Sequence, residues 1–227
     1  MLDMQDWQAI ELTIKLASVT TFILLLVGTP IAYWLSQTRS FWKPLVSAIV
    51  ALPLILPPTV LGFYFLLVMG PQGWLGQLTN YLGLGTLAFT FPGLVVASVC
   101  YSLPFVVQPI QNTMEQLDPA IWEVSSMLGA RPFDQFFTVI LPLTKTGFVT
   151  ACVLGFAHTV GEFGVILMIG GNIPEVTQVV SIQIYQHVET LNYDKAHQLS
   201  LCMVVFSLVV LIWVYGFHRS YMNKVLK

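Results

Sequence analysis

The sequence predicts an all-α, polytopic membrane protein with about five transmembrane helices. Only 9 % of the 227 residues are charged, against about 25 % in an ordinary soluble domain, and 56 % are hydrophobic. The hydrophobic residues form continuous runs, such as 22–27, whereas a transmembrane β-strand alternates apolar and polar side chains. These features exclude a soluble enzyme and a disordered chain. The net charge of −2 also gives no basic surface for nucleic acid.

Five segments are long and apolar enough to cross a bilayer as helices of about 20 residues. The first lacks the basic flank of a cleaved signal peptide, so we expect it to be retained. The 71 residues from 44 to 114 contain no charged side chain and fit two spans with a turn between them. We therefore expect one transmembrane domain, 1–227, with its termini on opposite sides of the membrane. The expected spans are 14–35, 45–69, 89–110, 146–169 and 198–217.

The orientation follows from the basic residues, which are retained on the cytoplasmic side. Seven of the nine Lys and Arg residues fall in segments 36–44 and 111–145 and in the C-terminal tail. The intervening segments on the opposite side are 70–88, which has no charge, and 170–197, which has one basic residue, Lys195. We therefore expect the N-terminus outside the cell and the C-terminus in the cytoplasm.

The second expected span contains a proline-rich break. Pro53, Pro57 and Pro58 fall within six residues, and each removes a backbone hydrogen-bond donor from a helix. Broken backbone is not stable in contact with lipid, so the break either lines a water-filled path or is buried as a kink that shapes packing. Pro57, Pro58 and Thr59 are therefore candidates for a translocation path or its gate.

The fourth expected span carries two ionisable residues, His158 and Glu162, and such residues at membrane depth indicate function. Their i, i+4 spacing places them on one helical face. They form either a local pair that satisfies two buried polar groups or part of the wall of the path and its gate. No nucleophile is placed with them, so we expect no catalytic residue. We also expect no metal site, because the cysteines lie singly in apolar runs, at Cys100, Cys152 and Cys202.

Segment 111–145 has signals for secondary structure of its own. Asp118-Pro119 is typical of an N-cap and a first helical turn, and Gly129 is typical of a helix stop, which predicts a short helix over 119–128. A second helix begins at Arg131-Pro132. Its apolar residues recur at i, i+3, i+4 and i+7 and form one face, namely Phe133, Phe136, Phe137 and Ile140.

The same segment resembles the EAA loop of ABC-importer permeases. That pattern reads Glu-Ala-Ala, three residues, Gly, nine residues and Ile-x-Leu-Pro. Here Val124 and Ser125 replace the two alanines and Val139 replaces the isoleucine. The resemblance implies a cytoplasmic loop, about 111–145, that couples the permease to an ATPase. The residues implied in coupling are Glu123, Ser126, Gly129, Ala130, Leu141 and Pro142.

Nearly the whole chain resembles permeases of the molybdate, tungstate and sulfate group. The resemblance lies in 28–30, 56–62 and 161–164, and 170–174 is closest to the molybdate members. It implies the type I ABC-importer permease (MetI-like) fold in the bacterial cytoplasmic (inner) membrane, and transport of an oxyanion, most closely molybdate. Sulfate, tungstate or another small solute is the alternative. An ion-coupled secondary transporter or a membrane enzyme fits less well, because the chain shows no internal repeat and no cluster of polar catalytic groups.

The chain contains no Gly-Lys dipeptide and therefore no Walker A phosphate loop. The resemblance thus implies that ATP and Mg belong to a separate cytoplasmic ATPase in two copies, and that this chain has no cofactor of its own. Two ATPase copies and one loop per chain imply a homodimer with the path at its interface. The other implied partners are a periplasmic or surface substrate-binding protein and the lipid bilayer.

Overall fold

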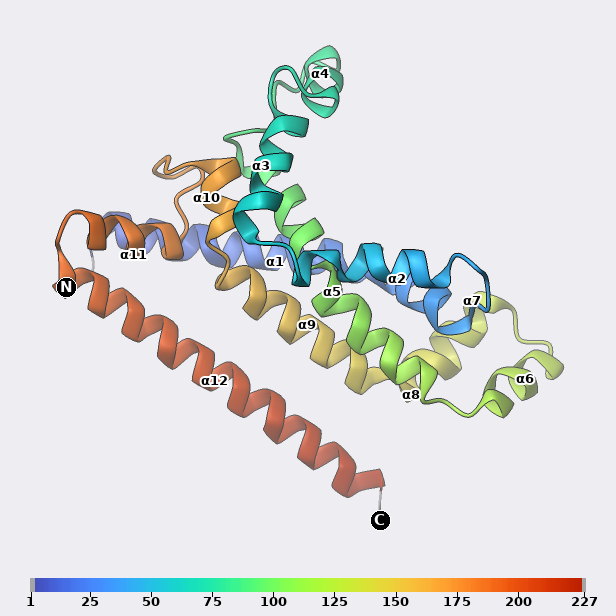
Figure 1. Cartoon of the computed structure of the whole chain (residues 1–227). Helices are drawn as coiled ribbons and strands as arrows, with labels where there is room; N and C mark the ends of the chain where they lie inside the picture. The colour runs from blue at the N-terminus through green and yellow to red at the C-terminus, as the bar shows by residue number, and fades with distance from the viewer. Residues whose placement is uncertain (1–2, 226–227) are drawn as a thin grey trace.

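The computed structural model describes residues 3–225, and the side chains of the last helix as far as residue 213. Within this range the regular elements are all helical, which confirms the predicted class (Figure 1). In chain order they are α1 (Met4–Gln37), α2 (Lys43–Ala51), η1 (Leu52–Leu54), α3 (Pro58–Met69), α4 (Trp74–Tyr81), α5 (Phe91–Glu115), α6 (Pro119–Met127), α7 (Pro132–Gln135), η2 (Phe136–Ile140), α8 (Leu141–Leu143), α9 (Lys145–Val160), α10 (Gly164–Gly170), α11 (Val180–Glu189) and α12 (Tyr193–Val225).

The helices agree with about five spans. Among the described residues, α1, α5 and residues 193–213 of α12 are each long and apolar enough to cross a membrane. Two bent helix pairs bring the number to five if each pair counts as one span. In these pairs α3 is bent by 107° from α2 and η1, and α9 is bent by 78° from residues 132–143.

The predicted break in the second span is confirmed. The first half ends at Leu54 and α3 begins at Pro58. Pro57 and Pro58 have no N–H group to continue the hydrogen-bond ladder, so the helix cannot pass through them. The bend turns α3 out of line with α2, so that α3 packs beside α10, and α4 projects from the rest of the bundle (Figure 1).

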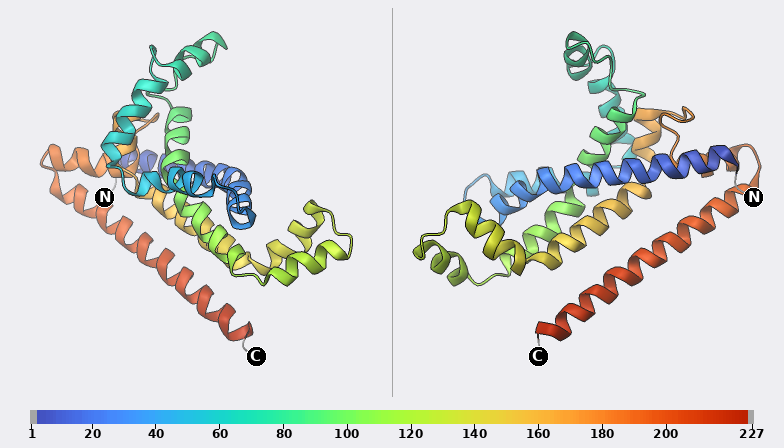
Figure 2. Two further views of the ribbon diagram at one scale, coloured as in Figure 1. Left: turned by 45° about the vertical axis from the view of Figure 1, so that its right-hand side comes forward. Right: turned by 180° about the vertical axis from the view of Figure 1, so that it is seen from behind.

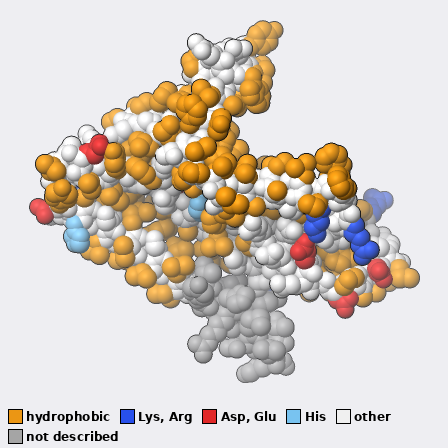
Figure 3. All heavy atoms as spheres, viewed as in Figure 1, with side chains coloured by type: hydrophobic (Ala, Val, Ile, Leu, Met, Phe, Trp, Pro, Cys, Tyr) orange, Lys and Arg blue, Asp and Glu red, His pale blue; other side chains and the backbone are white. Residues whose placement is uncertain are grey.

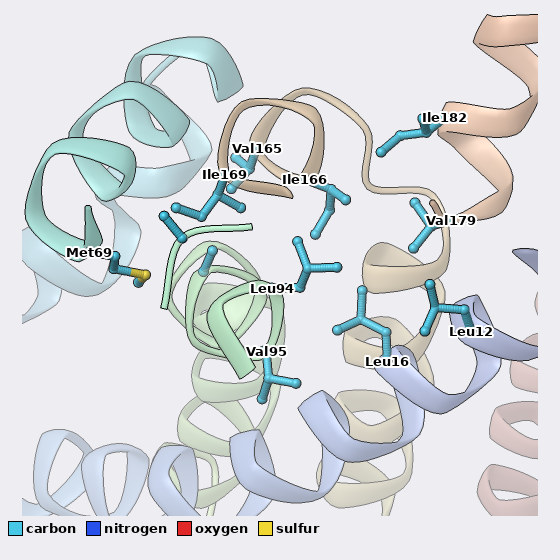
Figure 4. Close-up of a cluster of buried hydrophobic side chains, with 12 residues drawn as sticks. Leu12, Leu16, Met69, Leu94, Val95, Val165, Ile166, Ile169, Val179 and Ile182 are labelled. Carbon is cyan, nitrogen blue, oxygen red and sulfur yellow. The ribbon is translucent and has the colours of Figure 1, made fainter. Parts of the chain in front are cut away.

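The fourth expected span, 146–169, is not one continuous helix, and that prediction is wrong in this respect. The helix α9 ends at Val160, where the N–H of Gly161 donates to the carbonyl of Ala157, and α10 begins at Gly164 after three intervening residues. The joint between them, residues 161–163, turns the chain so that α10 packs against α3 and α5. Figure 4 shows its side chains Val165, Ile166 and Ile169 beside Leu94 of α5.

Small residues allow α1, α5 and α9 to pack closely around one side chain. A Cβ atom added at Gly28 of α1 would lie 3.1 Å from Val106 Cγ1, and one added at Gly155 of α9 would lie 2.8 Å from Val106 Cγ2. Val106 itself is completely buried. Close packing of this kind is the usual source of stability between helices in a membrane, where lipid is as apolar as the side chains.

At one end of the bundle, the start of α1 is held by α11 and α12. The carboxylate of Asp6 is completely buried, accepts a hydrogen bond from the side-chain amide of Gln183 at 3.0 Å, and lies 2.9 Å from His187 Nε2. Nearby, Lys195 at the start of α12 forms an ion pair with Asp3. Segment 170–197 therefore lies beside the N-terminus.

At the opposite end, the turn between α1 and α2 lies beside segment 111–145. Lys43 and Glu115 form an ion pair at 3.0 Å, and the ring of Tyr33 packs edge-on against Trp122 and Phe136. In the face drawn in Figure 3, the Lys and Arg side chains gather at this end, while hydrophobic side chains cover α2 and α3. The basic segments 36–44 and 111–145 therefore lie at the same end of the bundle. This is expected for a chain whose spans cross the membrane in alternating directions.

Candidate coupling loop and translocation path

The short helix predicted over 119–128 is present as α6. The side chain of Asp118 accepts a hydrogen bond from the backbone N–H of Ala120 at 2.9 Å, which satisfies one of the free donors of the first turn. Pro119 occupies the first helical position, where its missing N–H costs nothing. The N-cap that the sequence predicted is confirmed.

The end of α6 is a Schellman motif centred on Gly129. This glycine has φ +82°, its N–H donates to the carbonyl of Ser126 at 3.0 Å, and the N–H of Ala130 donates to the carbonyl of Ser125 at 3.2 Å. A Cβ atom at Gly129 would meet nothing within 4 Å. The conformation of the backbone, and not the space available, therefore explains a glycine here.

A buried glutamine links α6 to the segment that follows. Gln135 is 7 % exposed, and its side-chain amide donates to the carbonyl of Trp122 at 3.0 Å and to Ser125 Oγ at 2.5 Å. The hydroxyl of Ser126 donates to the same Trp122 carbonyl at 2.8 Å. Sequence reasoning missed Gln135, because a glutamine outside the apolar stripe of its helix predicts a solvated side chain.

The outer surface of α6 combines one charge with exposed apolar side chains. Glu123 is exposed and has no hydrogen-bond partner among the described residues. Met127 and Leu128 beside it are 86 % and 83 % exposed. Apolar side chains that a helix tip holds in water are typical of a protein contact surface.

The second predicted helix is present in three pieces, α7, the π-helix η2 and α8. In η2 the N–H of Leu141 donates to the carbonyl of Phe136, one residue further back than in an α-helix. Pro142 offers no N–H to the preceding turn and crowds it, and a wider turn accommodates its ring. The predicted apolar stripe is also divided: Ile140 is buried, whereas Phe133 and Phe137 are 79 % and 56 % exposed.

The two broken spans meet at their breaks. A Cβ atom added at Gly62 of α3 would lie 2.6 Å from Met168 Cβ of α10, and one added at Gly164 would lie 2.8 Å from Pro58 Cβ. The structure thus joins the proline break to the glycine-rich joint after α9. Pro57, Pro58 and Thr59 are themselves exposed.

Of the two alternatives for His158 and Glu162, the local i, i+4 pair is not formed. The helix α9 ends between them, and the ring of His158 instead stacks on Phe105 at 3.9 Å, with Nδ1 2.9 Å from Ser102 Oγ. Glu162 is 4 % exposed, and its carboxyl group makes no hydrogen bond of standard geometry among the described residues. The hydroxyl of Ser98, one turn before Ser102 on α5, is also buried and is the side chain with which the carboxyl group of Glu162 interacts.

Comparison with known proteins gives one consistent family. Residues 21–225 match the model of the family described as binding-protein-dependent transport system inner membrane component. The chain is 62 % identical over 214 residues to the molybdenum transport system permease protein ModB of Azotobacter vinelandii, covering 94 % of this chain and 95 % of that one. It is 32 % identical over 220 residues to ModB of Escherichia coli K12, covering 95 % and 96 %.

Among solved structures, the chain resembles a subunit of a bacterial alginate ABC transporter in complex with an alginate pentasaccharide-bound periplasmic protein. The TM-score is 0.78 at 18 % identity, covering 96 % of this chain and 80 % of that one. At this identity the likeness concerns the fold alone.

Proposed function

The chain belongs to the family of binding-protein-dependent transport system inner membrane components, and we propose that it is the permease subunit of an ATP-driven importer of molybdate. The observation that carries the proposal is the 62 % identity, over 94 % of the chain, to a permease of molybdenum transport. The loop around α6 supports it, since the cap, the Gly129 turn and the exposed tip form a rigid protrusion that a cytoplasmic ATPase can bind.

The mechanism that we propose is alternating access driven from α6. Two ATPase copies, which bind ATP and Mg, close on each other and move the α6 of each permease. Gln135 ties α6 to α7, and the continuous run of α7, η2 and α8 leads into α9. The far end of α9 carries the joint 161–163, which packs through Gly164 against the break of the second span. Movement at the loop therefore reaches both breaks through contiguous packed elements.

We further propose that two copies of the chain form the path between them. The helix α12 supports this assembly, because only 11 % of its most apolar stretch of 18 residues is buried within one chain. Exposed apolar side chains also cover α3, as at Phe63, Tyr64 and Leu67. We expect lipid and the second copy of the chain to cover these exposed apolar side chains. The substrate-binding protein then docks at the end that carries α11, opposite α6.

Uptake by the complete transporter tests the proposed function. Vesicles that contain the permease, its ATPase and its receptor are expected to take up labelled molybdate only when ATP and Mg are supplied. No span carries a basic residue in its middle, so cargo selection is expected to reside in the receptor. Changing the anion pocket of the receptor should therefore change the transported anion. A change of selectivity caused by Thr59→Ala or Ser98→Ala, with the receptor unaltered, would contradict this division of roles.

The proposed topology places the N-terminus outside and the C-terminus in the cytoplasm. After replacement of Cys100, Cys152 and Cys202 by alanine, a membrane-impermeant thiol reagent applied from outside is expected to label Leu75→Cys but not Ser220→Cys. Opening the vesicles should make the second position reactive and serves as the control. Labelling of position 220 alone in sealed cells would reverse the orientation.

Glu162 is proposed to belong to the gate at the joint. Burial without a positively charged partner makes the carboxyl group of Glu162 costly to ionise, and once ionised it repels an anion, so that cargo does not rest at the joint. Glu162→Gln is therefore expected to stabilise the folded permease by about 1–3 kcal/mol and to slow uptake by about tenfold. Thermal unfolding and vesicle uptake measure the two effects. The exposed Glu175→Gln is the matched control, with neither effect expected. Lower stability or unchanged uptake in Glu162→Gln would show that Glu162 is not part of the gate.

A further inference from the structure

An apolar groove of about 590 Å³ lies between α1, the segment α7–η2–α8 and the first part of α9. These three stretches of chain lie on the same face of the bundle in the right-hand view of Figure 2. The groove is in the range of about 300–1,000 Å³ that is usual for pockets that bind small molecules. Its lining is almost entirely aliphatic and aromatic, and includes Leu25, Leu26, Pro30, Phe133, Phe137 and Phe148.

The depth of the groove identifies the environment that fills it. Its wall on α1 extends from Leu25 to Tyr33, which is about 12 Å along the helix axis at 1.5 Å per residue. These residues belong to the cytoplasmic half of the first span in the proposed topology. The groove therefore begins within the hydrocarbon region and ends at the membrane interface. A water-soluble partner does not reach its inner end, whereas a lipid chain lies beside it.

Two exposed phenylalanines extend the groove at its interfacial end. The rings of Phe133 and Phe137 lie 6.5 Å apart and nearly parallel, at an interplanar angle of 13°, and both are more than half exposed. Apolar side chains presented by a short helix at the interface are typical of segments that insert between headgroups and acyl chains. The second half of the coupling segment therefore rests on the bilayer, while α6 points away from it.

Basic residues flank the part of the lining that comes from segment 132–148. Arg131 immediately precedes Pro132, and Lys145 lies between Leu141 and Phe148. One acidic residue, Asp134, lies within the same segment. At the cytoplasmic surface a Lys or Arg contributes about 1 kcal/mol toward anionic lipid. Arg131, which directly precedes the lining residue Pro132, therefore favours a negatively charged headgroup at this end of the groove.

We propose that this groove binds one acyl chain of an anionic phospholipid, with the phosphate beside Arg131 at the interfacial end. The bound lipid joins α1 to the segment that follows the coupling helix. This goes beyond the proposed function, because the groove takes part neither in the cargo path nor in the ATPase surface.

Photo-cross-linking to the full chain in nanodiscs tests the proposal. The probes are a phosphatidylglycerol and a phosphatidylcholine that carry the same photoreactive group on one acyl chain. Peptides containing Leu26, Phe133 or Phe137 are expected to be labelled about tenfold more by the phosphatidylglycerol. Leu26→Trp, which fills the groove, is expected to abolish this labelling. Phe22→Trp is the matched control, since Phe22 is equally exposed on α1 but does not line the groove, and it should retain the labelling.

A separate variant tests the proposed contact between the lipid headgroup and Arg131. Arg131→Gln is expected to equalise labelling by the two lipids and to leave the labelled peptides unchanged. Equal labelling of Leu26→Trp and Phe22→Trp would overturn the acyl-chain site. Equal labelling of the unaltered chain by both lipids would overturn the anionic headgroup. Recovery of a peptide from a second copy or from the ATPase cross-linked to Phe133 or Phe137 would show that protein, and not lipid, covers the groove.

Discussion

Gly129→Val is expected to abolish coupled uptake and to leave the permease folded and inserted. The residue has φ +82°, a conformation that costs a β-branched side chain about 1–3 kcal/mol. Since a Cβ atom would meet nothing within 4 Å, the added side chain makes no clash, and the strain acts on the turn alone. Relief of that strain breaks the hydrogen bonds that Gly129 and Ala130 make to the end of α6. The helix then changes its angle to α7 and no longer fits the ATPase.

Three measurements together define this result: co-purification of the ATPase, ATP turnover, and molybdate uptake by the same vesicles. Uptake is expected to fall by more than about tenfold, with membrane insertion unchanged. Gly129→Asn is the conservative control, because asparagine tolerates the left-handed region. Gly85→Val controls for strain, since Gly85 has φ +74° and equally open surroundings in the loop after α4. Both controls should transport normally. Normal uptake in Gly129→Val would refute the coupling role of α6.

Gly62→Leu is expected to separate α3 from α10 and to stop transport. A Cβ atom at Gly62 would lie 2.6 Å from Met168 Cβ and 3.3 Å from Val165 Cα, and both of these atoms are fixed to the backbone of α10. A change of rotamer therefore cannot relieve the contact, and the helices must move apart. We expect a loss of about 1–3 kcal/mol in stability and a fall in uptake of more than about tenfold.

The comparison that isolates this effect is Phe63→Leu. Phe63 is the next residue of α3 and is 47 % exposed, so leucine there changes neither the α3–α10 contact nor the fold. Gly62→Ala should give an intermediate loss, since it adds only the Cβ atom. Thermal unfolding and ATP-dependent uptake separate the two consequences. Unchanged unfolding and uptake in Gly62→Leu would mean that the two breaks do not move as one unit.

The local signals in the sequence predicted the elements around the candidate site well. Asp118, Pro119 and Gly129 each act on the backbone within a few residues, so the bounds of α6 followed from them. Pro57 and Pro58 predicted the break in the second span for the same reason. Comparison with known proteins agrees with the family resemblance that the loop pattern indicated.

The features that sequence reasoning missed depend on contacts between distant residues or on turns within apolar sequence. The joint at 161–163 lies within the apolar segment 146–169, so one continuous span was expected there, although Gly161 and Gly164 mark the turn. The contact of His158 with Ser102 joins residues 56 positions apart. No pattern along one segment predicts such a partner, and the i, i+4 spacing to Glu162 was misleading for that reason.

The contact between Asp6 and His187 also determines the order in which the protein can be completed. The two residues are 181 positions apart, so the ribosome needs roughly 10–40 s to add His187 after Asp6 at the usual rate of about 5–20 residues per second. During that interval Asp6 has no native partner in α11, and the backbone N–H of Asp3 is its nearby hydrogen-bond donor. Assembly of this end of the bundle is therefore a late event, in which α11 and the start of α12 hold the start of α1 in place.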